Sequence, residues 1–196
     1  MSQPDFDVAS FLAEPRRPAS VATVTQRGDP APATMWFAFA EGRLWFHTSS
    51  RSRIPSPFLA AAARGREIAV MIATFDPPHD VRQIRVTGPA RIEPTDPDRV
   101  KAVHRRYVDD WTQAWERQAT SADYHLWSLL PQRGMAVAYP GLSAVTECRW
   151  TRAADMPGRT EAPEPGGRRL RPSPHAQRAC ATAPALTSPP VHAGDR

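Results

Sequence analysis

The chain has 196 residues, of which 23% are charged and 41% are hydrophobic, and this length suffices for one domain with its own core. Its net charge of +5 comes from arginines scattered along the chain, with no basic stripe or recognised motif, so we do not expect a nucleic-acid-binding protein. The sequence has no apolar run of the roughly 20 residues that a membrane helix needs, no features of a secretory signal, and only two cysteines. We therefore expect a reduced, cytoplasmic protein without a membrane anchor.

The first third of the chain predicts one helix and a three-stranded meander. The apolar spacing in Asp5–Ala13 indicates a short amphipathic helix. Three β-rich segments follow, and Glu41-Gly42 between the second and third has the composition of a two-residue hairpin turn. The three predicted strands are Ser20–Thr25, Ala33–Ala40 and Arg43–Thr48.

The middle of the chain predicts two helices and four more strands. Gly88-Pro89 lies inside the longest of these strands and indicates a bulge or a sharp bend. The predicted helices are Pro57–Arg64 and one long helix from about Asp98 to Gln118, and the predicted strands are Glu67–Thr74, Arg82–Ile92, Met135–Tyr139 and Ser143–Trp150. Six to seven short strands joined mostly by hairpins favour a mainly β fold, a closed or half-closed antiparallel barrel with flanking helices.

The composition changes near residue 154. Residues 155–196 are rich in Pro, Ala and Arg, contain no aromatic residue and show no apolar period. Such a segment buries too little apolar surface to offset its ordering entropy. We therefore predict a domain over residues 1–154 and a disordered tail over residues 155–196.

The exit of the third predicted strand, Phe46–Arg53, concentrates hydroxyl and guanidinium groups just before a helix. Hydroxyls donate to phosphate oxygens and arginine forms bidentate charge-assisted pairs, so this segment suits a phosphate. A solvated polar loop is the simpler alternative. The candidate phosphate ligands include Thr48, Arg51, Ser52 and Arg53.

The strand Arg82–Ile92 has one polar and one apolar face. Gln83, Arg85 and Thr87 share a face, where an amide and a cation could meet the polar edge of a heterocycle. A strand with one face in water explains the pattern equally well. The histidines have no paired spacing typical of a metal site, so we predict none, and no catalytic residue can be named from the sequence.

Two of these motifs and the order of the elements match a known family. The chain from about Phe11 to Pro94 resembles the pyridoxamine 5′-phosphate oxidase-like split β-barrel superfamily, which includes FMN- and F420-dependent oxidoreductases. The run Arg82–Gly88 resembles the R-Q-[VI]-R-[VI]-x-G strand of that family, and Ser52-Arg53 stands where the family has Ser-Arg-Lys. The remaining support comes from Phe11-Leu12-Ala13, Ser20–Thr25, Thr34–Phe39 and Arg43–Thr48.

The resemblance implies an FMN-binding split β-barrel that forms a homodimer, with FMN or F420 in each of two grooves between the subunits. It places His47, Thr48, Ser52 and Arg53 in contact with the cofactor, and Arg51 could add a cation beside them. It also places Gln83 in contact with the cofactor, with the strand containing Met35, Trp36 and Phe37 along the ring face, and we expect Arg85 beside Gln83 because the two share a strand face. The expected function is hydride transfer between the cofactor and a small organic substrate.

Several departures from the family favour a second hypothesis. Thr34, Phe39 and Ile54 stand where the oxidase branch has cations, although Arg51 could compensate. The C-terminal R-L-x-x-R substrate motif is absent, so we do not expect oxidation of vitamin B6. The alternative is a non-catalytic split-barrel protein that binds flavin, haem or another planar ligand.

Overall fold

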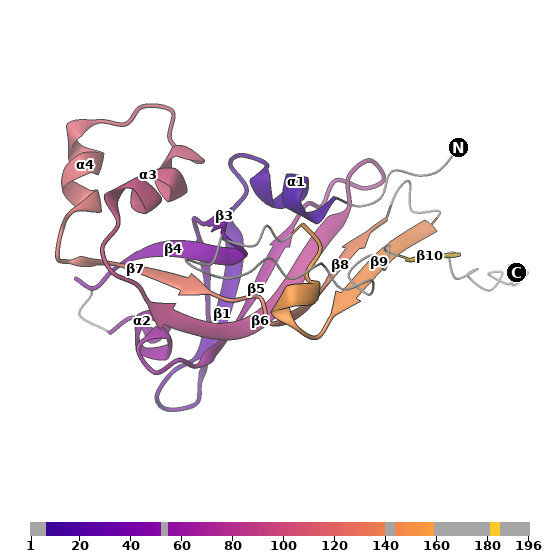
Figure 1. Cartoon of the computed structure of the whole chain (residues 1–196), viewed down its shortest axis with the longest axis horizontal. Helices are drawn as coiled ribbons and strands as arrows, with labels where there is room; N and C mark the ends of the chain where they lie inside the picture. Colours follow the sequence, from indigo (N-terminus) through magenta and orange to yellow (C-terminus); the bar gives the residue numbers. More distant parts are fainter. Residues whose placement is uncertain (1–6, 52–54, 140–143, 159–180, 185–196) are drawn as a thin grey trace, which may run out of the picture.

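The computed structural model describes residues 7–51, 55–139, 144–158 and 181–184, and its strands form a curled half-barrel with helices on its outside (Figure 1). All strand pairs are antiparallel, and a main sheet has the order β10-β9-β8-β6-β5-β1-β2. A second sheet has the order β3-β4-β7 and joins the end of β6. The strands are β1 Ala19–Val24, β2 Pro30–Met35, β3 Ala38–Ala40, β4 Arg43–Ser49, β5 Glu67–Ala73, β6 Arg82–Ile92, β7 Tyr124–Leu129, β8 Arg133–Ala138, β9 Ala144–Trp150 and β10 Ala181–Pro184. The predicted fold class is confirmed.

Strand β6 belongs to both sheets and passes from one to the other at Gly88. Its first part, through Thr87, pairs with β8, and its last part, from Ala90, pairs with β7. Gly88 lies so close to the connection between β7 and β8 that a Cβ atom there would come within 1.7 Å of the Leu130 carbonyl oxygen. The predicted irregularity at Gly88-Pro89 is therefore the point at which β6 changes partners.

The core fills the space between the two sheets. Along β5, buried and exposed residues alternate strictly, so Ile68, Val70 and Ile72 point inward. From the second sheet, Phe46 and Trp127 stack with ring centroids 4.3 Å apart, and both are fully buried. These side chains belong to one continuous cluster of buried residues that also holds Phe11 and Phe37.

Four short helices cover the half-barrel. Each of the first three begins with a side-chain cap, in which Asp7, Ser56 or Asp96 accepts hydrogen bonds from backbone N–H groups of the first turn. In Figure 1, α3 and α4 lie together over β4 and β7, and α2 lies on the opposite side of these strands. The helices are α1 Val8–Ala13, α2 Pro57–Ala62, α3 Pro97–Arg105 and α4 Gln113–Ala119.

Two predicted elements are interrupted, and Tyr107 takes part in both interruptions. The predicted strand Ala33–Ala40 is split into β2 and β3, because the Phe37 N–H donates to the Tyr107 hydroxyl at 3.1 Å instead of to a neighbouring strand. The predicted helix Asp98–Gln118 is split into α3 and α4. The Tyr107 hydroxyl donates to the Arg17 carbonyl at 2.8 Å, and the Arg106 guanidinium donates to the Leu12 and Glu14 carbonyls. These long-range hydrogen bonds hold the chain in a turn at the end of α3.

Two further segments differ from the sequence-based expectation. Strand β7 is missing from the predicted elements, although it is central to the second sheet. In the predicted tail, Met156 is buried and Ala181–Pro184 pairs with β9 as β10. Residues 159–180 and 185–196 of that tail lie outside the described residues.

Candidate functional site

One face of the main sheet is exposed and mixes apolar side chains, several of them alanines, with polar and charged ones. Neighbouring strands align them in rows, since Ser20 pairs with Met71, Met71 with Arg85, and Arg85 with Met135. Met71 is 40% exposed, and Phe75, which continues the same alternation beyond the end of β5, is 83% exposed. We call this surface the outer face, and its members include Ser20, Ala22, Ala69, Met71, Ala73, Phe75, Gln83, Arg85, Thr87 and Met135, together with the charged Glu67, Arg133 and Arg149.

Gln83 and Arg85 form the polar centre of the outer face. The Arg85 Nε donates to the Gln83 Oε1 at 2.9 Å. This bond orients the Gln83 amide so that its NH₂ group is left to donate, and it leaves the terminal nitrogens of Arg85 for another acceptor. Among the described residues no carboxylate pairs with Arg85. The sequence correctly predicted that these two side chains share one polar face.

The strand-exit residues lie on the second sheet, at the end of β4. The Thr48 hydroxyl accepts a hydrogen bond from the Trp127 Nε1 at 2.9 Å, so its own proton remains to be donated. Arg51 forms an ion pair with Asp123. Ser52 and Arg53, the other two predicted phosphate ligands, lie outside the described residues. Thr48 and Arg51 thus remain candidate ligands, but Arg51 already has an anionic partner.

His47 points to the other side of β4 from Thr48, into an aromatic cluster beneath α3 and α4. Alternation along β4 requires this, because Phe46 and Thr48 face the barrel interior. The His47 Nδ1 lies 3.1 Å from the His104 Nε2, and the His47 ring stacks on Tyr124. Trp36 joins the same cluster, stacked on Tyr107 with centroids 4.9 Å apart.

The described chain therefore does not bring all predicted site residues into one pocket. Gln83 and Arg85 lie on the outer face, whereas Trp36 and His47 lie in the aromatic cluster. Phe37 is fully buried and does not offer its side chain to a ligand, and Met35 packs partly buried against the core. His104 and Tyr107 were missed as site neighbours, because their spacing predicted only the apolar side of a helix.

Burial keeps both histidines of the cluster neutral. Desolvation, followed by the nearby His104 and His125 rings, lowers the pKa of His47 to about 4, and desolvation also lowers the pKa of His104. His104 is 5% exposed, and its Nδ1 has no hydrogen-bond partner in the described structure. An unpaired acceptor costs less than an unpaired N–H group in this ring, so the favoured tautomer has the His104 Nε2–H donating to the His47 Nδ1.

The buried His47–His104 pair is expected to make the folded chain less stable in mild acid. The pKa of His47 is about 4 in the folded chain, and an unfolded histidine titrates near 6.5, so protonation favours unfolding. The stabilisation is complete above pH 6.5 and is lost as the pH falls toward 4, by about 2 kcal/mol after discounting for partial exposure. Urea unfolding at a series of pH values measures it. His47→Phe should flatten the curve in this range, and an unchanged slope would contradict the assignment.

The described residues contain no group of three or more His, Cys, Asp or Glu side chains placed to hold a metal ion. No helix among them is long and apolar enough to cross a membrane.

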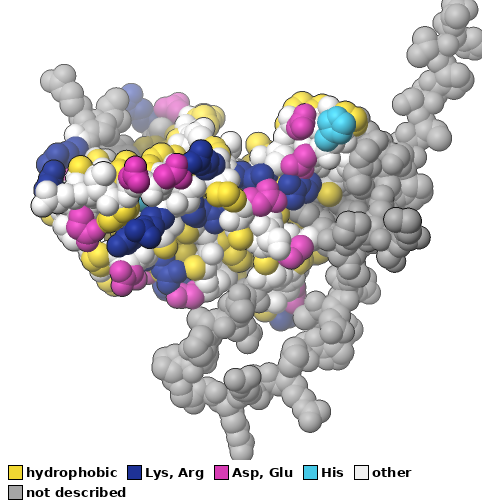
Figure 2. Space-filling view, turned by 90° about the horizontal axis from the view of Figure 1, so that it is seen from above, with side chains coloured by type: hydrophobic (Ala, Val, Ile, Leu, Met, Phe, Trp, Pro, Cys, Tyr) yellow, Lys and Arg dark blue, Asp and Glu magenta, His cyan; other side chains and the backbone are white. Residues whose placement is uncertain are grey.

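Figure 2 shows one face of the molecule, on which basic and acidic side chains are interspersed. Ion pairs such as Arg16–Asp109 and Arg82–Glu14 join side chains of opposite sign in the same way.

The architecture defines the class of protein as an antiparallel split β-barrel. The profile of the pyridoxamine 5′-phosphate oxidase family matches residues 7–138, and the chain belongs to this family. The predicted resemblance is thus confirmed. No curated protein sequence matches the chain.

Solved structures share the fold at low sequence identity. A conserved hypothetical protein, Rv2991 from Mycobacterium tuberculosis, is 22% identical, with a TM-score of 0.53 over 68% of this chain and 82% of that one. The haem storage protein HutZ from Vibrio cholerae is 17% identical, with a TM-score of 0.51 over 68% and 93%. A haem-binding protein from Mycobacterium smegmatis is 17% identical, with a TM-score of 0.52 over 76% and 60%. These similarities establish the fold and leave the ligand open.

Proposed function

We propose that the chain is a homodimeric oxidoreductase that holds FMN or F420 between two copies of the outer face and acts on a small organic molecule. One observation carries this proposal: the outer face exposes the apolar side chains of Met71 and Phe75 beside the polar Gln83–Arg85 pair. Exposed apolar patches of this kind mark interaction surfaces. The short side chains of Ala22, Ala69 and Ala73 allow another surface to approach the sheet closely.

A second copy of the same face is the partner that fits best. Two-fold pairing places identical surfaces against each other, so the apolar side chains of one outer face can be covered by the outer face of the partner. Phe75 has most of its ring in water and would become buried against the partner subunit. Such pairing also brings Gln83 and Arg85 of one protomer toward groups of its partner, which supports a ligand site shared by two chains.

The residues present fit the ring of a flavin-type cofactor better than its phosphate. The Gln83 NH₂ group and the Arg85 guanidinium can both donate to the carbonyl and nitrogen atoms at the ring's polar edge. Thr48 has a hydroxyl proton to donate to a phosphate. Arg51 would have to break its ion pair with Asp123 before it could bind that phosphate. The bound cofactor would supply the hydride chemistry, while these side chains orient it and the dimer excludes water.

The residues expected near the cofactor phosphate favour a second function. This function is non-catalytic binding of flavin, haem or another planar ligand. Phe39 packs against the core where the oxidase branch has a lysine, and Thr34 is exposed where that branch has an arginine. Arg51, the cation that the structure describes at this strand exit, is already paired to Asp123. The two proposals differ in one measurement, because a binding protein would hold the cofactor without reducing or oxidising a substrate.

Gln83→Ala tests the ring contact. Loss of one or two hydrogen bonds to the ring edge should weaken the bound cofactor about tenfold. Fluorescence titration with FMN and with F420 measures the affinity. Gln113→Ala removes the same side chain from the exposed surface of α4 and should leave affinity unchanged. Equal affinity of Gln83→Ala and the unmodified protein would remove Gln83 from the site.

A further inference from the structure

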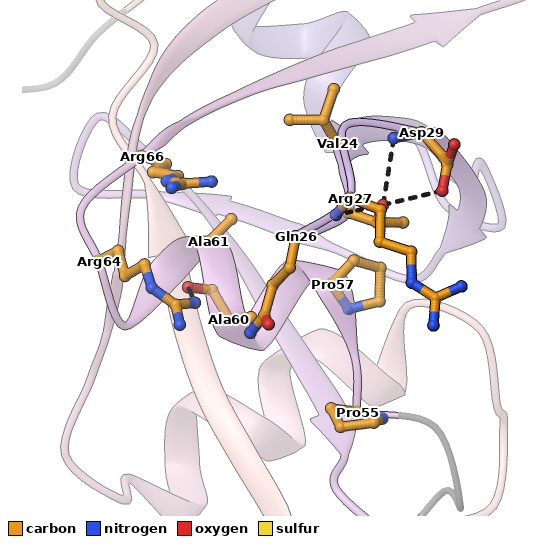
Figure 3. A pocket seen from close by; sticks show the side chains of 11 residues that line it. Val24, Gln26, Arg27, Asp29, Pro55, Pro57, Ala60, Ala61, Arg64 and Arg66 are labelled. Carbon is orange, nitrogen blue, oxygen red and sulfur yellow. Dashed lines mark hydrogen bonds between the residues drawn. The ribbon is translucent and has the colours of Figure 1, made fainter.

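A cavity lies between the turn joining β1 to β2 and one side of α2 (Figure 3). Its volume is about 520 Å³, within the range of pockets that bind small organic molecules. Apolar groups form much of its wall, contributed by Val24, Pro55, Pro57, Ala60 and Ala61. The cavity therefore suits a ligand with an apolar body.

Positive charge surrounds this apolar wall. Three arginines line the cavity, Arg27 on one flank and Arg64 and Arg66 on the other, as Figure 3 shows, against the single carboxylate of Asp29. Among the described residues, neither Arg27 nor Arg66 has a carboxylate partner. Guanidinium groups without a partner in the protein are suited to bidentate pairing with a carboxylate or a phosphate.

The backbone holds these arginines in place. Arg66 accepts a hydrogen bond from the Ala90 N–H and donates its own N–H to the Ala61 carbonyl, both at 3.0 Å. Arg64 folds back along α2, where its Nη1 donates to the Ala60 carbonyl at 3.0 Å. Thr25 fixes the opposite flank by accepting hydrogen bonds from the N–H groups of Arg27 and Asp29.

The cavity is separate from the Gln83–Arg85 pair. Gln83 pairs with Ala73 at one end of β5, whereas Arg66 precedes the other end of that strand at Glu67. A strand rises about 3.3 Å per residue, so the two places are about 20 Å apart along β5. A ligand in the cavity would thus be additional to one that contacts Gln83.

We infer that this cavity binds a small organic anion, whose carboxylate or phosphate pairs with the arginines and whose apolar body lies against α2. The inference does not depend on the proposed oxidoreductase function. Calorimetric titration of the full chain with decanoate, decyl phosphate, decan-1-ol and acetate tests it. We expect one site for decanoate or decyl phosphate, at least tenfold weaker binding of decan-1-ol, and no binding of acetate. The preferred headgroup distinguishes a carboxylate from a phosphate ligand.

Two variants probe the charge and the space. Arg64→Gln/Arg66→Gln should weaken the anion at least tenfold, whereas the matched surface variant Arg105→Gln/Arg117→Gln should not. Ala60→Phe fills the cavity and should block binding, with circular dichroism confirming that each variant is folded. Equal binding of decan-1-ol, equal loss in both arginine pairs, or full binding by Ala60→Phe would overturn the inference. Loss of FMN or F420 binding in Arg64→Gln/Arg66→Gln would also overturn it, because the cavity would then belong to the cofactor site.

Discussion

Gly88→Ala is expected to lower the free energy of unfolding by about 3 kcal/mol or more. The added Cβ would lie 1.7 Å from the Leu130 carbonyl oxygen and 2.9 Å from the Gln132 nitrogen. Both neighbours are backbone atoms, so the connection between β7 and β8 must move. That movement would disturb both the β6–β7 and the β6–β8 pairing. Urea unfolding followed by circular dichroism measures the loss.

Gly28→Ala is the matched control for this substitution. Gly28 has a φ of +91° but no atom within 4 Å of the added Cβ, so its replacement tests backbone strain without a clash. We expect a loss of about 1 kcal/mol there. Similar losses at the two positions would show that close approach at Gly88 does not hold the two sheets together.

Ala69→Glu is expected to convert the proposed dimer to a monomer and to reduce cofactor affinity more than 100-fold. Ala69 lies in the outer face, between Ala22 on β1 and Thr87 on β6. The added carboxylate is harmless in an isolated chain, where it meets water. In the dimer, two carboxylates would be buried near the same interface, at a cost of several kcal/mol each. Sedimentation velocity measures the assembly, and fluorescence titration measures the affinity.

Ala102→Glu makes the same chemical change on an exposed position of α3 and should leave both assembly and affinity intact. A monomeric Ala69→Glu that still bound the cofactor with full affinity would show that the site lies within one chain. A dimeric Ala69→Glu would place the subunit contact elsewhere on the molecule.

The sequence predicted the elements whose signals are local. A mostly apolar run identified β5 and alternation identified β6, both with nearly correct bounds, and Glu41-Gly42 formed the expected turn with positive φ at both residues. The split of one strand and one helix could not be predicted, because both depend on Tyr107 contacting residues 70 and 90 positions away. Strand β7 escaped prediction because its residues Leu126–Leu129 are all buried, so the strand shows no alternation of apolar and polar residues.

The candidate site was predictable only where it lies on a single strand. Gln83 and Arg85 share a face because they are two residues apart, which is a local property. The same rule places His47 and Thr48 on opposite sides of β4, so adjacency in sequence did not make them neighbours in a site. The contact between His47 and His104 spans 57 residues and depends on how α3 packs on β4. No sequence pattern carries that information.

Sedimentation of the purified chain with FMN or F420, recorded at the cofactor's own absorption band, tests the central proposal most directly. We expect the cofactor to move with a particle of twice the chain mass of 21.7 kDa, at one cofactor per chain. A chain that sediments as a monomer, or a dimer from which both cofactors remain free at micromolar concentration, would contradict it.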